Sequence, residues 1–266
     1  MNLVSLVVAA VLAVAPAQDK ITLTFNPKQG DKLSKVEKSE MSMKATVSVG
    51  GQDQKIEFGQ RESEQSSLEF IQVAGGAVVK AVLTCKEDVE EKKGPQAPDW
   101  ERTEKPLHGR KITMSMTDGK LVTEGADGLD DKTKKKLDLN DRTSRLYPKT
   151  PVGPGDSWEV ARDDVRAFLA DEETLKDAKI KVTFVEIKDV DGRRCAVLNA
   201  LMEISGKAPG EIDIAIKMDA QMTVWIDRGY ALTVKGKGTM TMNAANDQFK
   251  MKGEGPMTME ITTKAE

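Results

Sequence analysis

Residues 212–226 read IDIAIKMDAQMTVWI, with an apolar side chain at every second position. Polar side chains occupy most of the positions between them. A period of two is typical of a β-strand with one dry face and one wet face. The gain from burying these side chains roughly offsets the entropy that is lost when the backbone becomes ordered. The dry face is therefore expected to need a cover, which can be another sheet, a helix or a ligand.

The same alternation resumes twice before the end of the chain. Asp227-Arg228-Gly229 is a turn signal, and a second alternating run extends from Tyr230 to Met242. A second turn at Asn246-Asp247 precedes a third run from Phe249 to Ile261. Residues 211–264 are therefore predicted to form an antiparallel meander of three long strands.

Further strand and turn patterns occupy the rest of the chain. A short strand is predicted at Ile21–Phe25, and hairpins are predicted across Gly50-Gly51, Gly75-Gly76, Asp118-Gly119 and Asp191-Gly192. The strand pattern weakens at Ser63–Ser67, and the mixed charge run Lys86–Lys93 is interpreted as a solvated strand end. Helices are predicted over Asp127–Leu139, with Asp127 as N-cap, and over Asp163–Ala178, where an amphipathic helix would cap one open end of the sheet.

These patterns predict a mainly β protein of long antiparallel meanders in two similar halves. The halves are expected to form a curved sheet or incomplete barrel with two short helices; two stacked sheets are the flatter alternative. We expect a signal peptide over 1–17, a first β half with a terminal helix over 18–140, a Pro/Gly-rich junction over 141–158, and a second β half with one helix over 159–266. Together the halves are expected to make one compact domain.

The N-terminus has the composition of a secretory signal. An uncharged apolar run from Leu3 to Ala15 leads into Ala15-Pro16-Ala17, which predicts cleavage before Gln18. The run is short for a membrane span, so a retained anchor is the weaker alternative. We expect an exported protein, periplasmic or extracellular, without a transmembrane segment after cleavage. A net charge of −3 gives no basis for nucleic-acid binding.

Two cysteines, Cys85 and Cys195, fall in predicted strands of different halves. An oxidising compartment permits a disulfide between them, which would close a long loop and stabilise the fold. Two separate buried thiols are the equal alternative, because sequence cannot bring the two Cα atoms within the ~7 Å that a bridge requires.

The sequence offers little for catalysis. His108 is the only histidine, which excludes a metal site built from several histidines, and the chain has no zinc spacing, nucleophile elbow, phosphate loop or dinucleotide fingerprint. A Ser-His-Asp triad through His108 is the one nucleophilic arrangement left open. Asp213, Asp219 and Asp227 are interpreted as solvated residues of the wet face. We therefore expect a protein without catalytic activity, cofactor or metal.

Methionine is the unusual residue. Four Met-[Ser/Thr]-Met triplets begin at Met41, Met114, Met240 and Met257, and on a strand both sulfurs of a triplet face the same side. Three interpretations are open: a core filled by flexible side chains, a cavity that adapts to acyl chains or other apolar ligands, and a Cu(I) site of thioethers. The candidate ligand-binding residues are Met218, Met222, Met240, Met242, Met257 and Met259. The alternative function is a structural or protein-interaction domain of the cell envelope with a filled core.

The most distinctive string is Pro151-Val152-Gly153-Pro154-Gly155-Asp156-Ser157-Trp158. Its Gly155-Asp156 repeats Gly30-Asp31 at the opening of the first half, which suggests an internal duplication. With Leu107-His108-Gly109-Arg110-Lys111 and the Thr/Met-rich hairpin beside it, the string resembles a family of exported bacterial β-rich proteins of unknown function. That resemblance implies export and two β-rich halves joined at this string, and it implies no activity. The predicted fold also resembles the envelope carriers of lipoproteins and lipids, an analogy of fold alone.

Overall fold

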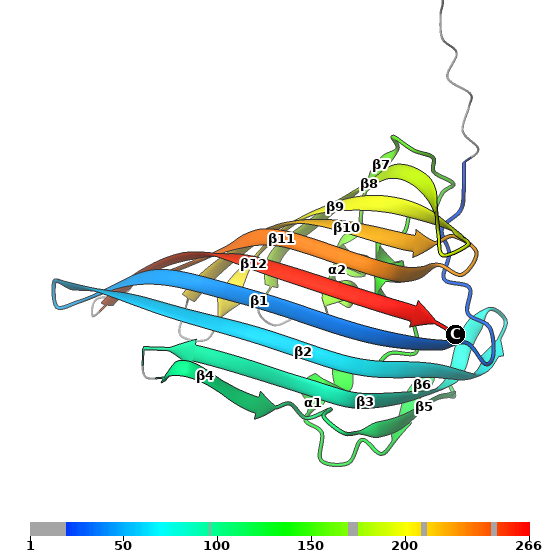
Figure 1. Ribbon diagram of the computed structural model, residues 1–266, viewed down its shortest axis with the longest axis horizontal. Helices are drawn as coiled ribbons and strands as arrows, with labels where there is room; N and C mark the ends of the chain where they lie inside the picture. Colours follow the sequence, from blue (N-terminus) through cyan, green and yellow to red (C-terminus); the bar gives the residue numbers. More distant parts are fainter. Residues whose placement is uncertain (1–19, 96, 170–174, 209–211, 246–248) are drawn as a thin grey trace, which may run out of the picture.

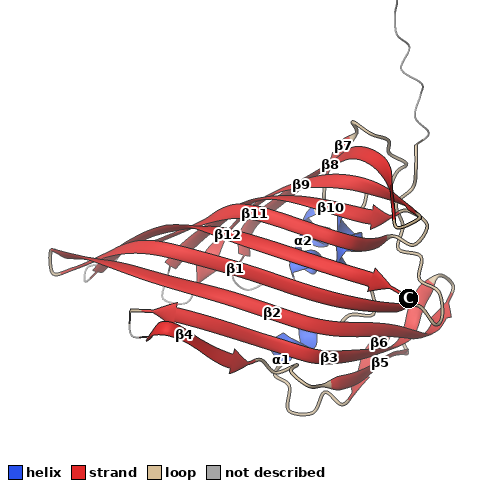
Figure 2. Cartoon of the chain, viewed as in Figure 1, coloured by secondary structure: helices blue, strands red, loops and turns tan. Residues whose placement is uncertain are grey.

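The computed structural model describes residues 20–266 apart from 96, 170–174, 209–211 and 246–248. The expected signal peptide at 1–17 therefore lies outside the described residues. Within them, the chain forms one curved antiparallel sheet of twelve strands, two short α-helices and one 3-10 helix (Figures 1 and 2). The prediction of a mainly β fold is confirmed.

The elements follow the chain in a simple order. The strands are β1 (Lys32–Val49), β2 (Gln52–Ala74), β3 (Ala77–Gly94), β4 (Ala97–Glu104), β5 (Lys111–Thr117), β6 (Lys120–Glu124), β7 (Ser157–Glu159), β8 (Leu175–Val190), β9 (Arg193–Ala208), β10 (Ile212–Trp225), β11 (Tyr230–Ala245) and β12 (Phe249–Ala265). The helices are α1 (Asp131–Lys135), η1 (Arg142–Leu146) and α2 (Arg162–Leu169).

The strand order across the sheet is β6-β5-β3-β2-β1-β12-β11-β10-β9-β8-β7, and β4 pairs with β3 beside β5. The sheet is unclosed, because β6 and β7 stand at opposite ends of this order. β1 pairs with β12 over nearly its whole length, from Leu33 opposite Ala265 to Val49 opposite Phe249. This pairing of the first and last long strands joins the two halves in the middle of the sheet.

The meander at the C-terminus is confirmed as β10, β11 and β12, and the four predicted turn dipeptides each close a two-residue hairpin. One face of the sheet carries the helices, and we call it the inner face. There, Leu146 of η1 and Val165 of α2 belong to a core with Phe184, Leu198 and Met222 of the second half. A second core joins strands of the first half to the segment around α1, and it includes Phe70, Ile112, Met114, Leu137 and Leu139.

The same turn occurs at the start of both halves. Gly30-Asp31 and Gly155-Asp156 each place a glycine at positive φ, 87° and 92°. The glycine N–H donates to the carbonyl of a phenylalanine, Phe70 at 2.8 Å and Phe184 at 2.7 Å, and that phenylalanine N–H donates back to the aspartate carbonyl at 2.9 Å. A shift in strand register follows each phenylalanine. The two turns that share the Gly-Asp dipeptide in the sequence therefore also share their backbone hydrogen bonds.

Three local predictions were wrong. Ile21–Phe25 makes only an isolated bridge, Ile21 to Val152. The helix predicted over Asp127–Leu139 is one short turn, α1, capped by Asp130, whose carboxylate accepts from Thr133 N at 2.6 Å. The helix predicted over Asp163–Ala178 ends at Leu169, and Leu175 already begins β8. Leu175 and Ala178 are three positions apart, a helical spacing, but both pair with β9, and the strand accommodates this spacing through a register shift between Leu175 and Asp177.

The disulfide considered between Cys85 and Cys195 is absent, and both are free, buried thiols. Cys85 lies on β3 and Cys195 on β9, with five strands between them in the sheet order. Because neighbouring strands are about 4.8 Å apart, the sheet holds the two cysteines in separate places.

Candidate functional site

A contiguous group of half-buried apolar side chains covers the inner face near the hairpin ends of the long strands. We call it the apolar patch, and it consists of Met41, Ile204, Ile212, Ile214, Ile216, Met240, Met242, Met251 and Met257. The strand register makes the patch continuous, since Ile214 lies opposite Met242 and Ile216 lies opposite both Met240 and Ile204. Figure 2 shows the two helices behind the middle of the sheet, away from its left-hand hairpin ends.

Methionines and glycines alternate across the strands that carry this patch. Met240 is opposite Gly255, and Met242 is opposite Gly253. The Met43 sulfur lies 3.0 Å from where a Cβ of Gly253 would be, so this methionine lies flat over the glycine of the next strand. Met218 covers Gly236 in the same way, at 2.8 Å. The glycines therefore leave space on the inner face because they have no side chain, and the long methionine side chains fill that space.

The structure brings the six predicted methionines to this face but gives them different roles. Met222 and Met218 are only 1% and 6% exposed and belong to the core of the second half. Met257 and Met259 pack against that core and remain half-buried, as do Met240 and Met242. Only the last four keep surface that a ligand could contact. The structure adds isoleucines of β9 and β10, which the methionine pattern could not indicate.

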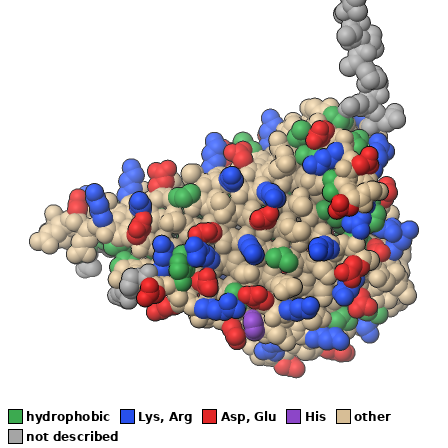
Figure 3. Space-filling view, in the orientation of Figure 1, with side chains coloured by type: hydrophobic (Ala, Val, Ile, Leu, Met, Phe, Trp, Pro, Cys, Tyr) green, Lys and Arg blue, Asp and Glu red, His purple; other side chains and the backbone are tan. Residues whose placement is uncertain are grey.

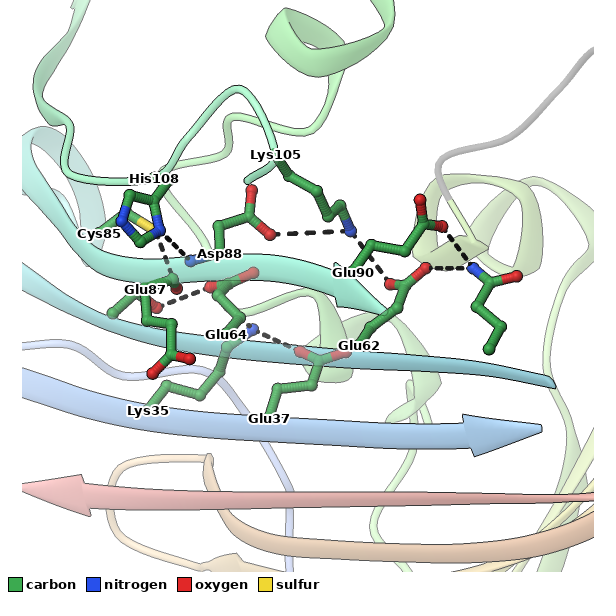
Figure 4. Close-up of polar contacts among 12 residues, drawn as sticks. Lys35, Glu37, Glu62, Glu64, Cys85, Glu87, Asp88, Glu90, Lys105 and His108 are labelled. Carbon is green, nitrogen blue, oxygen red and sulfur yellow. Dashed lines mark hydrogen bonds and ion pairs between the residues drawn. The ribbon is translucent and has the colours of Figure 1, made fainter. Parts of the chain in front are cut away.

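A network of charged side chains borders the apolar patch on the inner face of β1, β2 and β3. This polar ladder consists of Lys35, Glu37, Glu62, Glu64, Asp88, Glu90 and Lys105 (Figure 4). The register places Glu37 opposite Glu64 and Glu64 opposite Asp88, an arrangement that is repulsive without cations. Lys35 Nζ lies 2.8 Å from Glu37 and 3.8 Å from Glu64. Lys105, which follows β4, places its Nζ 3.0 Å from Glu62 and 3.7 Å from Asp88.

The pKa shifts in the polar ladder follow from these contacts. Burial alone would raise the pKa of Glu62, but the hydrogen bond and charge of Lys105 outweigh it and hold that pKa below its usual value. For Asp88, which is 5% exposed, burial is the largest effect and leaves the pKa raised despite Lys105. Burial would lower the pKa of Lys35, yet Glu37 and Glu64 outweigh it and the pKa is raised. The two lysines therefore stay charged and keep the carboxylates together.

The polar ladder corrects two interpretations of the sequence. Asp88 and Val89 are buried, so Lys86–Lys93 is not simply a solvated strand end. The weak pattern at Ser63–Ser67 marks the place where β2 turns Glu64 and Ser66 toward the inner face; Ser66 Oγ donates to Glu64 at 2.7 Å. Polar residues on both faces of a strand leave no periodicity, so this network could not be located from the sequence.

The side chains around the polar ladder are poorly placed for nucleophilic chemistry. His108 Nδ1 accepts a hydrogen bond from Asp88 N at 3.3 Å, and its Nε2 lies 3.5 Å from Glu104, so both ring nitrogens are already engaged. Burial, reinforced by Glu64 and Asp88, raises the pKa of Cys85 to about 12, which keeps the thiol protonated and unreactive. Within the described part of the chain, no three His, Cys, Asp or Glu side chains form a group that could hold a metal ion.

The outer face carries a hollow of about 1070 Å³ that crosses the middle of the sheet from β4 to β8. Most of its lining residues occupy the wet positions of the strands, but Met259, one of the predicted methionines, and Glu62 of the polar ladder also line it. Figure 3 shows acidic and basic side chains interspersed over this face. They pair across neighbouring strands, as in Glu40 with Arg61 and Lys235 with Glu260, each at 3.0 Å. The charged side chains of this face have one another and water as partners, so their presence there does not require a ligand.

Comparisons with known proteins identify a fold and no family. No protein-family model matches the sequence, and no curated protein sequence matches it. A structure described as lipid–protein interactions in lipovitellin is similar, with a TM-score of 0.50 and 6% identity, over 90% of this chain and 26% of that chain. The present chain thus spans about a quarter of that protein. Identity this low shows likeness of fold alone.

Two further solved structures are more distant. DynF from the dynemicin biosynthesis pathway of Micromonospora chersina has a TM-score of 0.23 and 9% identity, over 94% of this chain and 87% of its own. A DUF1329 family protein from Desulfovibrio piger has a TM-score of 0.16 and 11% identity, over 89% and 85%. Scores this low carry no argument. Separately, none of the helices in the described ranges is long and apolar enough to cross a membrane.

Proposed function

We propose that this protein is an exported, non-catalytic binding protein that holds an apolar, lipid-like ligand against the apolar patch. The strongest support for this proposal is the apolar patch, in which isoleucines and methionines outside the buried core form a continuous, half-buried group. Apolar surface left in contact with water costs about 25 cal/mol per Å², and a ligand that covers it recovers that free energy. Methionine suits the role because its flexible thioether adapts to irregular apolar shapes.

The fold and the sequence lend further support. Lipovitellin, whose structure is described by its lipid–protein interactions, has a similar fold over most of this chain. The apolar run before Gln18 and the resemblance to exported bacterial β-rich proteins support the export part of the proposal.

The test compares two double variants of strand β11. Met240→Asp/Met242→Asp places charge in the apolar patch, whereas Thr239→Asp/Thr241→Asp adds the same charge to the opposite face of the same strand. Native mass spectrometry of protein purified from its own cells should show an apolar adduct on the wild type and the control, and none on the first variant. Stripping the adduct should lower Tm, because a ligand bound only by the folded state stabilises it.

A filled-core structural domain predicts a different result. The wild type would carry no adduct, and its Tm would not respond to stripping or to an added fluorescent fatty acid. Met240→Asp would then be severely destabilising, because an unpaired charge would be buried in the core. That combination would overturn the binding proposal in favour of a structural or protein-interaction role.

A further inference from the structure

One end of the sheet is an unprotected edge strand. β6 pairs with β5 on one side, and no other described strand pairs with its free side. Along it, Leu121 is 37% exposed and Val122 is 46% exposed, and Met116, opposite Leu121 on β5, is 44% exposed. Edge strands with apolar side chains and free backbone groups are templates for pairing with another chain. At the other end of the order, β7 has only three residues.

The turn that joins β5 to β6 fixes which backbone groups face this edge. Asp118-Gly119 forms a two-residue hairpin, so Thr117 and Lys120 are a hydrogen-bonded pair. Hydrogen-bonded and non-hydrogen-bonded pairs alternate along an antiparallel ladder. Residues 120, 122 and 124 therefore direct their backbone groups toward β5. Leu121 and Thr123 direct their N–H and C=O groups to the free side.

The sequence of β6, Lys120-Leu121-Val122-Thr123-Glu124, is complementary to itself when it is reversed. An antiparallel pairing centred on Val122 places Leu121 opposite Thr123 of a second copy, and both of these residues offer free backbone groups. The same register places Lys120 opposite Glu124 of the second copy. The two Lys120–Glu124 pairs are non-hydrogen-bonded pairs, in which side chains approach most closely.

The charges support this register. Lys120, Val122 and Glu124 alternate with Leu121 and Thr123, so they share one face of the strand. Both charged residues are exposed, and within the described part of the chain neither has an ion-pair partner. Opposite charges directly across a strand pair are favourable, and like charges are unfavourable.

We propose that β6 is a self-association edge, at which two copies of this chain pair antiparallel about a two-fold axis through Val122. The two sheets would then continue into one another. The contact is isologous, because each copy contributes the same five residues. It is also smaller than a standard interface, so the dimer is expected to be weak and to depend on protein concentration.

Sedimentation velocity of the purified protein tests the proposal, over a range from about 1 to about 200 µM that spans weak association. The wild type should shift from monomer to dimer. Lys120→Glu and Glu124→Lys each place like charges at both symmetric contacts, and each alone should weaken the dimer by about tenfold or more. An equimolar mixture of the two variants restores both opposite-charge pairs and should form a heterodimer. The double variant Lys120→Glu/Glu124→Lys should recover the homodimer.

Two further variants separate the edge from other surfaces. Thr123→Pro removes an outward N–H without removing a donor to β5, and it should abolish the dimer while the circular dichroism spectrum stays unchanged. Lys237→Glu, on the outer face of central strand β11, is the matched charge reversal and should have no effect on association. A monomer at every concentration would overturn the proposal. So would a dimer that survives Thr123→Pro, or single charge variants that fail to associate when mixed.

Discussion

At the scale of single residues, two glycines of β12 allow atoms of the neighbouring strand β1 to lie close to the β12 backbone. An ideal Cβ on Gly255 would stand 2.7 Å from the Cα of Met43, which is backbone and cannot move aside cheaply. A Cβ on Gly253 would stand 3.0 Å from the Met43 sulfur and 3.0 Å from the Ala45 Cβ, which are both side-chain atoms. The two glycines of β12 therefore differ in the freedom of their neighbours, although both are buried and on the same face.

Replacing each glycine by alanine should reveal this difference. Gly255→Ala forces backbone apart and should lower the free energy of unfolding by about 3 kcal/mol, the upper part of the usual range for overpacking. Gly253→Ala should cost less, about 1 kcal/mol, because the added methyl would meet side-chain atoms of Met43 and Ala45 at 3.0 Å and no backbone. Urea unfolding followed by circular dichroism measures both. Equal losses for the two variants would contradict the expectation that the backbone contacts of Gly255 are more costly to relieve than the side-chain contacts of Gly253.

At the scale of elements, alternation predicted the strands well wherever one face was dry. β10, β11 and β12 were located from period two alone, and so were the hairpins with glycine-containing turns. The sequence failed where both faces of a strand are polar, as at Glu62 and Glu64, because nothing then marks which side chains turn inward. It also failed at the start of β8, where Leu175 and Ala178 have a helical spacing and a register shift in the pairing with β9 could not be predicted. The six candidate methionines share the inner face, as period two predicts, but their sequence does not show that Met218 and Met222 are buried in the core while the other four are half-buried.

β7 is the shortest strand, and a tryptophan holds it in place. Trp158 packs against the core of the second half, and its indole N–H donates to the Leu146 carbonyl of η1 at 2.8 Å. Trp158→Ala should therefore lower the free energy of unfolding by about 3 kcal/mol. Trp158→Phe keeps an aromatic ring and loses the hydrogen bond, so it should cost about 1 kcal/mol. Thermal and urea denaturation give both values, and a loss below about 1 kcal/mol for alanine would contradict the anchoring role.

At the scale of the whole molecule, the sheet depends on a strand at the end of the chain. β12 lies between β1 and β11, so removing residues 249–266 would expose two long edges in the middle of the sheet. Such a truncated chain is expected to be insoluble or unfolded, because unpaired flat edges associate with one another. Replacing β4, which among the described strands pairs with β3 alone, by a short Gly/Ser linker is the control and should leave a folded protein. Solubility and far-ultraviolet circular dichroism report the outcome, and a soluble, cooperatively unfolding chain without β12 would contradict the expectation.

The pairing of β1 with β12 also means that β1 stays without one of its partner strands during much of translation. Val49 pairs with Phe249, and Leu33 pairs with Ala265. Roughly 200 residues must therefore be synthesised between the two partners, which takes about 10–40 s at ~5–20 residues per second. Throughout that interval β1 can pair with β2 on one side, and its other edge has no partner strand. The growing chain therefore presents a long unpaired strand edge to its surroundings until β12 has been made. A cell that makes this protein safely has to shield the unfinished chain or hold it unfolded until the last strand is available.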